Sequence, residues 1–331
     1  MAVWTAILDF ETFFSKELTF MLNFHPLRLE DLSRLRRYFN MNPGRLCDST
    51  PGSTFIWRDL YTVEYAEDNG SLYFKVTVPD MGATFPLPLG HDREEHFKTL
   101  ADYCCASGIP ISFYPVPREE LPALQAYFPN TAAVSNRDSA DYLYRAEDLK
   151  YFKGKKLSGQ RNHVNRFHKS YDGLWEFRPI TPDDFPALSD FLDRYTQRWN
   201  KPSPSFLEDI PKTREVLEHL RTYGLSGGML LVEGVIAGFS LGEVVGDTLF
   251  IHIEKADRDY DGCYQMLVSQ FAQTFAVDGV EFINREDDTG DPGLRTSKLS
   301  YHPVALLEKF SVTVEEPCAY APGCGCCTKE N

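Results

Sequence analysis

Residues 227–254 of the 331-residue chain read GGMLLVEGVIAGFSLGEVVGDTLFIHIE, and this stretch is the most informative about the fold. Three apolar runs are separated by Glu233-Gly234 and by Gly246-Asp247. Glycine beside an acidic residue, between two apolar runs, is typical of the tight turn in a β-hairpin. The stretch therefore predicts a three-stranded antiparallel meander.

Helical and extended patterns surround this meander in a definite order. Upstream lie a strand pattern at 174–180 and a helix at 182–199, for which Thr181 is the N-cap and Pro182 the first helical residue. A second helix is expected at 206–224. Downstream, a loop at 255–262 leads into a helix at 263–276 and a strand at 280–284. This order resembles that of a GNAT acyltransferase.

The first half repeats the pattern loosely, without a residue-level repeat. Alternating runs at 61–67 and 71–78 flank Asp68-Asn69-Gly70, which indicates a hairpin. A strand at 24–28 and a helix at 29–39 precede it. A helix that ends at Gly108, a strand at 110–117 and a helix at 118–128 follow. The chain is thus expected to be α+β.

The expected architecture is two tandem GNAT-like domains, each a mixed sheet flanked by helices. A chain of this length is about twice a typical domain, and its hydrophobic content of 43% suits two cores. We expect an N-terminal extension at 1–20, a first domain at 21–150, a basic interdomain helix at 151–170, a second domain at 171–316 and a Cys-rich tail at 317–331. The alternative for the first twenty residues is an amphipathic helix that packs on the body.

Composition limits the classes of function. A net charge of −14 argues against coating nucleic acid or anionic membrane, so a polyanion must meet a local basic patch. The eight cysteines have no framework spacing, and no transmembrane run is found, so we expect a cytoplasmic protein. Cys318, Cys324, Cys326 and Cys327 lack paired C-x-x-C spacing, so no metal is expected.

The strongest charge anomaly lies at 150–169, which holds seven basic residues and no acid, whereas the rest of the chain has a net charge of −21. Helical spacing puts Val164, Phe167 and Tyr171 on one apolar face. Four residues off this face are candidates for binding an anion: Arg161, Asn162, Asn165 and Arg166. The alternative is a solvated basic face on an interdomain helix.

A second candidate is the turn after the meander. In a GNAT fold this turn presents backbone N–H groups, and the next helix directs its positive end at the pyrophosphate of the acyl carrier. The candidate donor-binding residues are Lys255, Arg258, Gly262 and Tyr264. Three acids in the same loop oppose a pyrophosphate, so a solvated connection is the alternative.

The third candidate is the charged loop at 282–303, which follows a buried strand. Such a density of charge is costly unless it is solvated or belongs to a site. The candidate catalytic residues are Glu286, Asp287, Asp288 and Tyr301, and the candidate binding residues are Asn284, Arg285, Arg295 and Lys298. Here the acids would hold an ammonium or move a proton, and the cations would hold a carboxylate or phosphate. A structural ion-pair network is the alternative.

Three passages, at 157–167, 252–272 and 283–304, together resemble the bacterial family of uncharacterised proteins related to the C-terminal domain of phosphatidylglycerol lysyltransferase. The similarity spans roughly 21–315. It implies two tandem GNAT-like domains and, by kinship with the lysyltransferases and the Fem peptidyltransferases, aminoacyl-tRNA as the donor. The chain lacks the membrane-spanning part that presents lipid in the lysyltransferases, so a phospholipid acceptor is not expected.

The leading hypothesis is therefore an acyl- or aminoacyl-transferase that takes its donor into the second domain. Direct transfer requires orientation, a proton acceptor and donors for the developing oxyanion. The basic helix would meet tRNA, and a small molecule or peptide would be the acceptor. An acyl-CoA N-acyltransferase is one alternative, and a non-catalytic sensor of amino acids or nucleotides is another.

Overall fold

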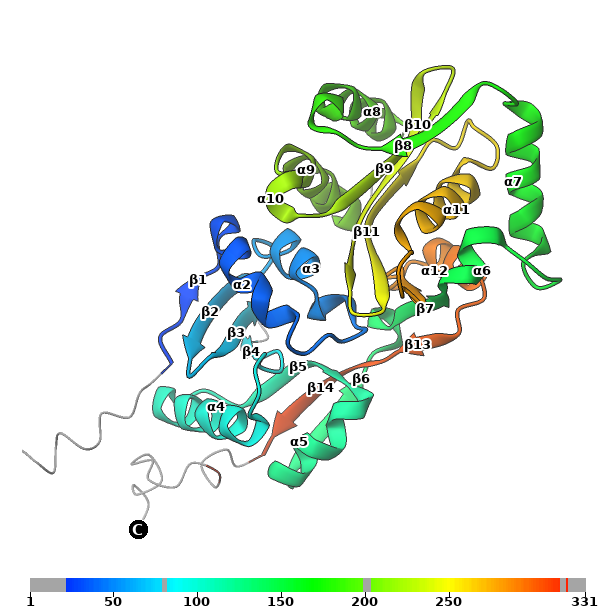
Figure 1. The fold of residues 1–331 in the computed structure, drawn as a ribbon. Coiled ribbons are helices and arrows are strands. Elements are labelled where there is room, and N and C mark those ends of the chain that lie inside the picture. The colour runs from blue at the N-terminus through cyan, green and yellow to red at the C-terminus, as the bar shows by residue number, and fades with distance from the viewer. Residues whose placement is uncertain (1–21, 79–81, 199–203, 316–319, 321–331) are drawn as a thin grey trace, which may run out of the picture.

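The computed structural model describes residues 22–78, 82–198, 204–315 and 320, so the expected extension at 1–20 and nearly all of the tail at 317–331 lie outside the described residues. Three sheets organise the described part of the chain (Figure 1). The first is antiparallel and has the order β1-β2-β3-β4. Its strands are β1 (His25–Pro26), β2 (Thr62–Asp68), β3 (Ser71–Val78) and β4 (Gly82–Thr84).

Turn and capping residues set the ends of strands and helices in the first half. The β2–β3 hairpin turns at Asn69 and Gly70, both with positive φ, as expected. Asp92 caps the start of α4, and Gly108 ends it with a φ of 66°. The helices are η1 (Leu29–Asp31), α2 (Leu32–Phe39), η2 (Cys47–Ser49), α3 (Pro51–Ile56), α4 (Arg93–Ser107), η3 (Arg118–Glu120), α5 (Leu121–Tyr127) and η4 (Arg137–Ser139).

The predicted meander is the centre of a seven-stranded sheet with the order β13-β7-β12-β11-β10-β9-β8. Its strands are β7 (Asp141–Arg145), β8 (Trp175–Pro179), β9 (Ser226–Val232), β10 (Val235–Val245), β11 (Thr248–Ala256), β12 (Phe282–Asn284) and β13 (Ala305–Leu307). The β11–β12 pair is parallel and joins the strands over three residues each, whereas β11 continues to Ala256 beside β10. The remaining pairs of this sheet are antiparallel.

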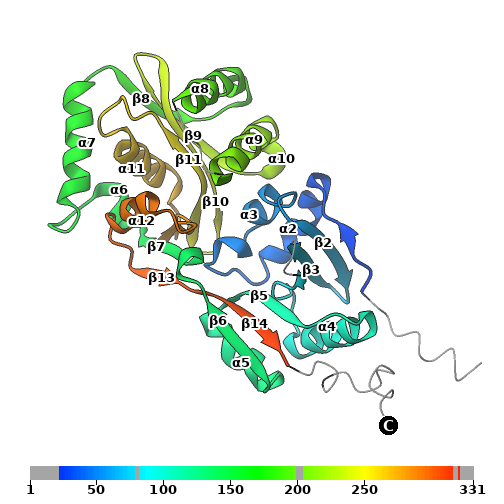
Figure 2. The same ribbon diagram turned by 180° about the vertical axis from the view of Figure 1, so that it is seen from behind.

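Helices cover both faces of this sheet (Figures 1 and 2). They are α6 (Ala146–Tyr151), α7 (Ser158–Ser170), η5 (Pro182–Asp184), α8 (Phe185–Gln197), α9 (Pro204–Glu218), α10 (Leu220–Tyr223), α11 (Cys263–Phe275) and α12 (Pro292–Leu299). The core under α11 contains Phe271 and Tyr144. The core on the opposite face joins Leu32 and Phe55 of the first half to Leu188 and Phe239 of the second. The two halves therefore share apolar core.

Two strands cross the division that was predicted at residue 150. Strand β7 precedes that boundary and pairs with β12 and β13 of the second half. Strand β14 (Lys309–Val314) lies in the second half and pairs with β5 (Ser112–Pro117) and β6 (Thr131–Ser135) to form a sheet with the order β5-β14-β6. Segments distant in sequence thus complete each half, and the predicted domain limits do not describe how the strands are shared.

The basic helix α7 packs on α11 at the outer face of the seven-stranded sheet and does not cross between the halves (Figures 1 and 2). Gly262 is the N-cap of α11, with a φ of 81°. A Cβ atom at this position would lie 2.2 Å from the carbonyl oxygen of His163 in α7. The two backbones therefore touch where α11 begins. Among the described helices, none combines the length and apolarity needed to cross a bilayer.

This contact predicts a difference between two glycine substitutions. Gly279 has a φ of 92°, and a Cβ there would meet open space. Gly279→Ala should lower the free energy of unfolding by about 1 kcal/mol, because left-handed backbone alone is strained. Gly262→Ala should lower it by about 3 kcal/mol, because the overlap with α7 is added. Urea unfolding of both variants measures the difference, and equal losses would contradict the contact.

Candidate functional site

A group of buried and partly buried polar side chains lies where the seven-stranded sheet meets β14 and the start of α3. Burial of charge in such a place is costly unless each group is paired. We call this group the junction cluster. Its members are Cys47, Asp48, Asp141, Glu243, His252, Asn284, Glu286, Asp287 and Lys309.

Lys309 is the central cation of the junction cluster, and its side chain is 2% exposed. Its Nζ lies 2.5 Å from Asp48 Oδ2, 2.8 Å from Asp141 Oδ1 and 3.5 Å from Asp287 Oδ2. Burial alone would lower the pKa of Lys309, but the nearby carboxylates, led by Asp48, raise it well above its usual range. Lys309 is therefore an ammonium at neutral pH.

Asp141 fixes the other side of this ammonium. Its Oδ2 accepts hydrogen bonds from the backbone N–H of Cys47 at 2.7 Å and from Asn284 Nδ2 at 2.9 Å. Burial, then Asp141 and Asp48, raise the pKa of Cys47, so the thiol stays protonated. Ligand atoms of Cys47, Asp48 and Asp141 lie within 4.8 Å of one another, a spacing that a metal ion could use. The Lys309 ammonium contacts all three.

His252 lies at a bulge in β11. Leu241 is opposite Ile253 and Gly242 is opposite Ile251, so His252 is the extra residue. Its Nδ1 lies 2.8 Å from Glu286 Oε1, and its Nε2 lies 3.2 Å from Glu243 Oε1. Burial would lower the pKa of His252, but the two carboxylates raise it to about 9. The ring is therefore an imidazolium at neutral pH.

Three carboxylates of the junction cluster reach the surface, with side-chain exposures of 31% for Asp48, 22% for Asp287 and 20% for Glu286. Burial, only partly offset by Lys309, raises the pKa of Asp287 to about 6. Burial raises the pKa of the Tyr61 and Tyr114 phenols, and the negative charges of Asp48 and Asp287 add to this effect. The mouth of the cluster is thus acidic.

The predicted residues of the charged loop separate into two groups. Asn284, Glu286 and Asp287 belong to the junction cluster. Asp288 does not, because its buried carboxylate accepts hydrogen bonds from Arg295 Nε at 2.9 Å and Nη2 at 2.6 Å. The Arg295 hydrogen bonds hold the pKa of Asp288 well below its usual range. The structure gives this pair the role of a structural ion pair, contrary to the expected contact with ligand.

Three further candidates from this loop support it from inside the core. Arg285 pairs with Glu254 at 2.6 Å and lies over the ring of Tyr301 at 4.6 Å. Burial raises the pKa of Tyr301 to about 12. This buried phenol is therefore a weak acid and does not suit the role of a proton donor to a substrate. Lys298 is buried and donates hydrogen bonds to the carbonyl oxygens of Arg285 and Asp287. These cations are consumed internally, which corrects the expectation that they hold a donor.

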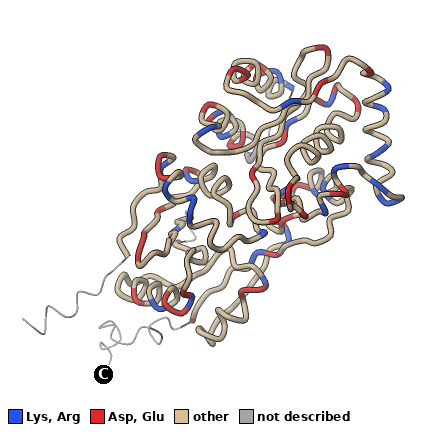
Figure 3. The backbone as a smooth tube through the Cα atoms, in the orientation of Figure 1, with Lys and Arg blue, Asp and Glu red and all other residues tan. Residues whose placement is uncertain are grey.

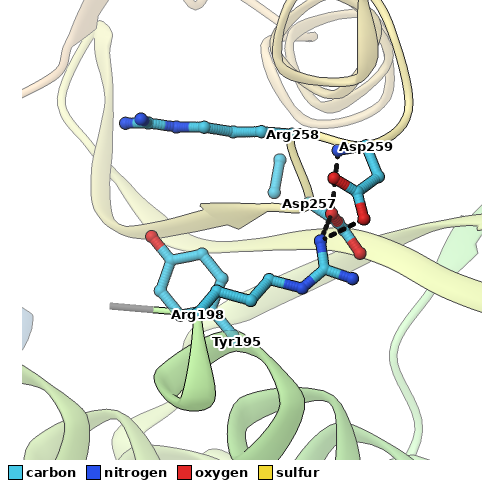
Figure 4. A pocket seen from close by; sticks show the side chains of 6 residues that line it. Tyr195, Arg198, Asp257, Arg258 and Asp259 are labelled. Atoms are coloured by element: carbon cyan, nitrogen blue, oxygen red, sulfur yellow. Dashed lines mark hydrogen bonds and ion pairs between the residues drawn. The ribbon is translucent and has the colours of Figure 1, made fainter. Parts of the chain in front are cut away.

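The turn after β11 does not form an open phosphate site. Gly262 is packed against α7, and Lys255 pairs with Asp209 at 2.7 Å. Tyr264 is half-buried and hydrogen-bonded to Tyr195. Figure 4 shows a pocket of about 390 Å³ at this end of β11, lined by Tyr195, Arg198, Ala256, Asp257, Arg258 and Asp259. In that pocket Arg198 forms ion pairs with Asp257 and Asp259, so its lining carries both signs of charge.

Helix α7 keeps part of the basic surface that was expected. Arg161 donates to the carbonyl oxygens of Phe152 and Gly154, so it closes the end of α6 and is not available to an anion. Arg166 is exposed and lies 3.2 Å from Asp261. Asn162 and Asn165 are exposed. Figure 3 shows lysines and arginines along α7 and the segment before it.

Sequence reasoning missed Glu243, His252, Asp141, Asp48, Cys47 and Lys309. A signal was present for three of them, because each is an ionisable residue that stands beside or within an apolar run. Glu243 interrupts FSLGEVV, His252 interrupts TLFIHIE and Lys309 interrupts LLEKFSV. Such residues are rarely buried without partners, so they point to a site.

Comparison with known proteins gives the family and the fold. The model of a family described as phosphatidylglycerol lysyltransferase, C-terminal, matches residues 44–313. An uncharacterised protein of Mycoplasmoides gallisepticum is 25% identical over 181 residues, a match that covers 55% of this chain and 58% of that relative. The chain thus spans little more than half the length of this curated relative.

Solved structures resemble the chain over most of its length. A conserved protein of unknown function from Bacteroides thetaiotaomicron is 30% identical, with a TM-score of 0.82, over 89% of this chain and 100% of that one. L-PGS from Bacillus licheniformis is 16% identical, with a TM-score of 0.61, over 87% of this chain and 94% of that one. FemX is 10% identical, with a TM-score of 0.60, over 90% of this chain and 99% of that one. The expected fold class, α+β with tandem GNAT-like domains, is confirmed.

The opposite pKa shifts of two adjacent acids predict opposite effects of their removal. Asp288→Asn should lower the free energy of unfolding by about 3 kcal/mol, because it leaves the Arg295 guanidinium without its buried partner. Asp287→Asn should leave stability unchanged or raise it by about 1 kcal/mol at pH 7.5, because burial already disfavours that charge. Chemical unfolding of the two variants checks this, and a larger loss for Asp287→Asn would contradict it.

His252 predicts a pH dependence of stability. Its pKa is raised from 6.5 to about 9 in the folded chain, so its contribution is complete below pH 6.5 and is lost as the pH rises through 9. The contribution should be about 3 kcal/mol, because each unit of pKa difference corresponds to about 1.4 kcal/mol. The difference in unfolding free energy between wild type and His252→Gln, measured from pH 6 to 9.5, should decline over this window. If the difference in unfolding free energy does not change with pH, His252 is not an imidazolium in the folded chain.

Proposed function

This chain belongs to the family of the phosphatidylglycerol lysyltransferase C-terminal domain, and on that premise we propose that it transfers an aminoacyl group from aminoacyl-tRNA to an amine or hydroxyl acceptor. The observation that carries the proposal is the acidic mouth of the junction cluster, where Asp48, Glu286 and Asp287 reach the surface beside buried cations.

The charge balance of the site favours a cationic ligand. Within the junction cluster five carboxylates face the cations Lys309 and His252, and Arg36 adds a third positive charge at 3.1 Å from Glu243. The buried Lys298, which donates to the Asp287 carbonyl oxygen, adds a fourth positive charge, so one negative charge stays uncompensated when all groups are ionised. An aminoacyl ester carries an ammonium beside its reactive carbonyl, whereas a simple acyl thioester does not. The site thus discriminates in favour of an aminoacyl donor.

The transfer step follows from this placement. Asp48 and Glu286 hold the ammonium of the aminoacyl group, and this fixes the ester carbonyl beside Asp287. The acceptor nitrogen or oxygen attacks the carbonyl carbon and passes its proton to the Asp287 carboxylate. The bond from the carbonyl carbon to the ribose oxygen then breaks, and that oxygen takes up the proton, which leaves a new amide or ester and free tRNA. A pKa of about 6 suits Asp287 as a proton acceptor near neutral pH.

The donor tRNA requires a positive surface in an acidic chain. The exposed residues of α7 and the segment before it supply one, with Arg166 and Lys169 on the helix. Phosphate contacts of this kind are independent of sequence and weaken as salt rises. The proposed partner is therefore tRNA, and the proposed acceptor is a small molecule or peptide.

An acyl-CoA donor is disfavoured by the start of α11. The pyrophosphate would need the backbone N–H groups of this helix, yet Gly262 is packed against α7. Acids also line the turn, where Asp261 pairs with Arg166 and Asp257 with Arg198. A non-catalytic amino-acid sensor is the second candidate, favoured by two internal ion pairs, Arg285 with Glu254 and Asp288 with Arg295.

Binding and transfer experiments test the proposal. Each of a set of tRNAs charged with one radioactive amino acid is offered with candidate amine and hydroxyl acceptors, and the product is separated from tRNA. At least one charged tRNA should bind about tenfold more tightly than the same tRNA uncharged, by about 1.4 kcal/mol. Acetyl-CoA should not raise the melting temperature.

Matched variants separate the site from a general effect of charge. Asp287→Asn should reduce transfer by about a hundredfold, the usual size of a general-base effect. Asp278→Asn removes an exposed carboxylate from the turn before β12 and should leave transfer unchanged. If acetyl-CoA stabilises the protein and no charged tRNA is preferred, the aminoacyl proposal is wrong. Binding of an amino acid without transfer would support the sensor instead.

A further inference from the structure

Within the junction cluster, the side chains of Glu243 and His252 are almost completely buried, with exposures of 3% and 1%. The pair is nevertheless connected to the surface, because His252 Nδ1 contacts the partly exposed Glu286. A carboxylate, an imidazolium and a second carboxylate thus form a row from the interior to the mouth. Only the last member can touch a substrate.

The inner end of this row is held by the first half of the chain. Glu243 Oε1 accepts a hydrogen bond from the backbone N–H of Gly52 at 2.6 Å, and Oε2 accepts one from Arg36 Nη1 at 3.1 Å. Gly52 approaches so closely that a Cβ there would lie 2.4 Å from Glu243 Oε1 and 2.6 Å from His252 Nε2. Glu243 therefore has little freedom to rotate, and it fixes the ring that it contacts.

The outer end of the row is held by its own backbone. Glu286 has a φ of 56°, a left-handed conformation that a non-glycine residue adopts only at an energetic cost. Its N–H donates to Asn284 Oδ1 at 2.7 Å, and its carbonyl oxygen accepts from the N–H of Tyr142 at 3.2 Å. This left-handed turn directs the Glu286 side chain toward His252. Strain of this kind is retained where surrounding groups determine it.

We infer that Glu243 and His252 are positioning residues, which hold the Glu286 carboxylate as an oriented anion for the ammonium of the substrate. The inference rests on the proposed function, and it divides the work between adjacent acids. Glu286 has an imidazolium at 2.8 Å, whereas Asp287 has Lys309 no nearer than 3.5 Å. Glu286 is thereby assigned to binding and Asp287 to proton transfer.

This assignment of binding to Glu286 and of proton transfer to Asp287 predicts that the transfer rate has a bell-shaped dependence on pH. The charged groups that face His252 are Glu243 from β10 and Glu286 from the loop after β12, with Arg36 behind Glu243. Transfer should rise as Asp287 ionises near pH 6 and should fall as His252 loses its proton near pH 9. The alkaline limb belongs to a residue that does not touch the substrate.

The first test measures transfer against pH for wild type, His252→Gln and Glu243→Gln. His252→Gln should lose the alkaline limb, keep the acid limb, and lower the rate at pH 7.5 roughly tenfold, as loss of an orienting partner does at other sites. Glu243→Gln should move the alkaline limb to lower pH. His96→Gln is the matched control, because it alters a buried histidine that contacts Ser71 at 2.8 Å away from the cluster. A wild-type profile in His252→Gln would overturn the inference.

The second test needs no activity. In protein labelled with ¹⁵N-histidine, the NMR signals of His252 should be those of a doubly protonated ring at pH 8, and Glu243→Gln should lower the midpoint of its titration by about one unit or more. His96→Gln assigns the other buried ring and should leave this midpoint unchanged. A neutral His252 at pH 8, or a midpoint insensitive to Glu243, would overturn the inference. If no charged tRNA is a substrate, the proposed function fails while this test still decides the role of the pair.

Discussion

The Lys309 ammonium is the interaction on which the arrangement of the chain depends. It is nearly fully buried, so its charge is tolerable only while its carboxylate partners surround it. Those partners come from distant segments: Asp48 from η2, Asp141 from β7 and Asp287 from the loop after β12. One side chain on β14 therefore requires four segments to meet at one point. The same requirement explains why strands are exchanged between the halves.

Local structure was predictable because local patterns determine it. The meander, the Asn69-Gly70 hairpin, the capped start of η5 and the end of α4 at Gly108 all follow from neighbouring residues. The placement of β7, β13 and β14 did not follow, because their partners lie elsewhere in the sequence and short apolar strands do not specify them. The domain limits fail to describe the sheets for the same reason.

The site was predictable in part. Asn284, Glu286 and Asp287 were indicated by charge directly after a buried strand. Asp288 carried the same signal but pairs with Arg295. The left-handed backbone at Glu286 turns the loop, so sequence spacing cannot assign the direction of each side chain. Glu243, His252 and Lys309 each stand beside or within an apolar run, a signal that marks a buried charge but does not identify its partners.

The exchange of β14 has a consequence for synthesis on the ribosome. Lys309 and Cys47 contact each other across 262 residues of sequence, and β14 lies between β5 and β6 of the first half. Until β14 emerges, β5 and β6 have no common neighbour, and Asp141 lacks its buried cation. Contacts of such long range close late and slowly. The nascent first half should therefore depend on chaperones for longer than its length suggests, because its completion waits for residues that are translated long afterwards.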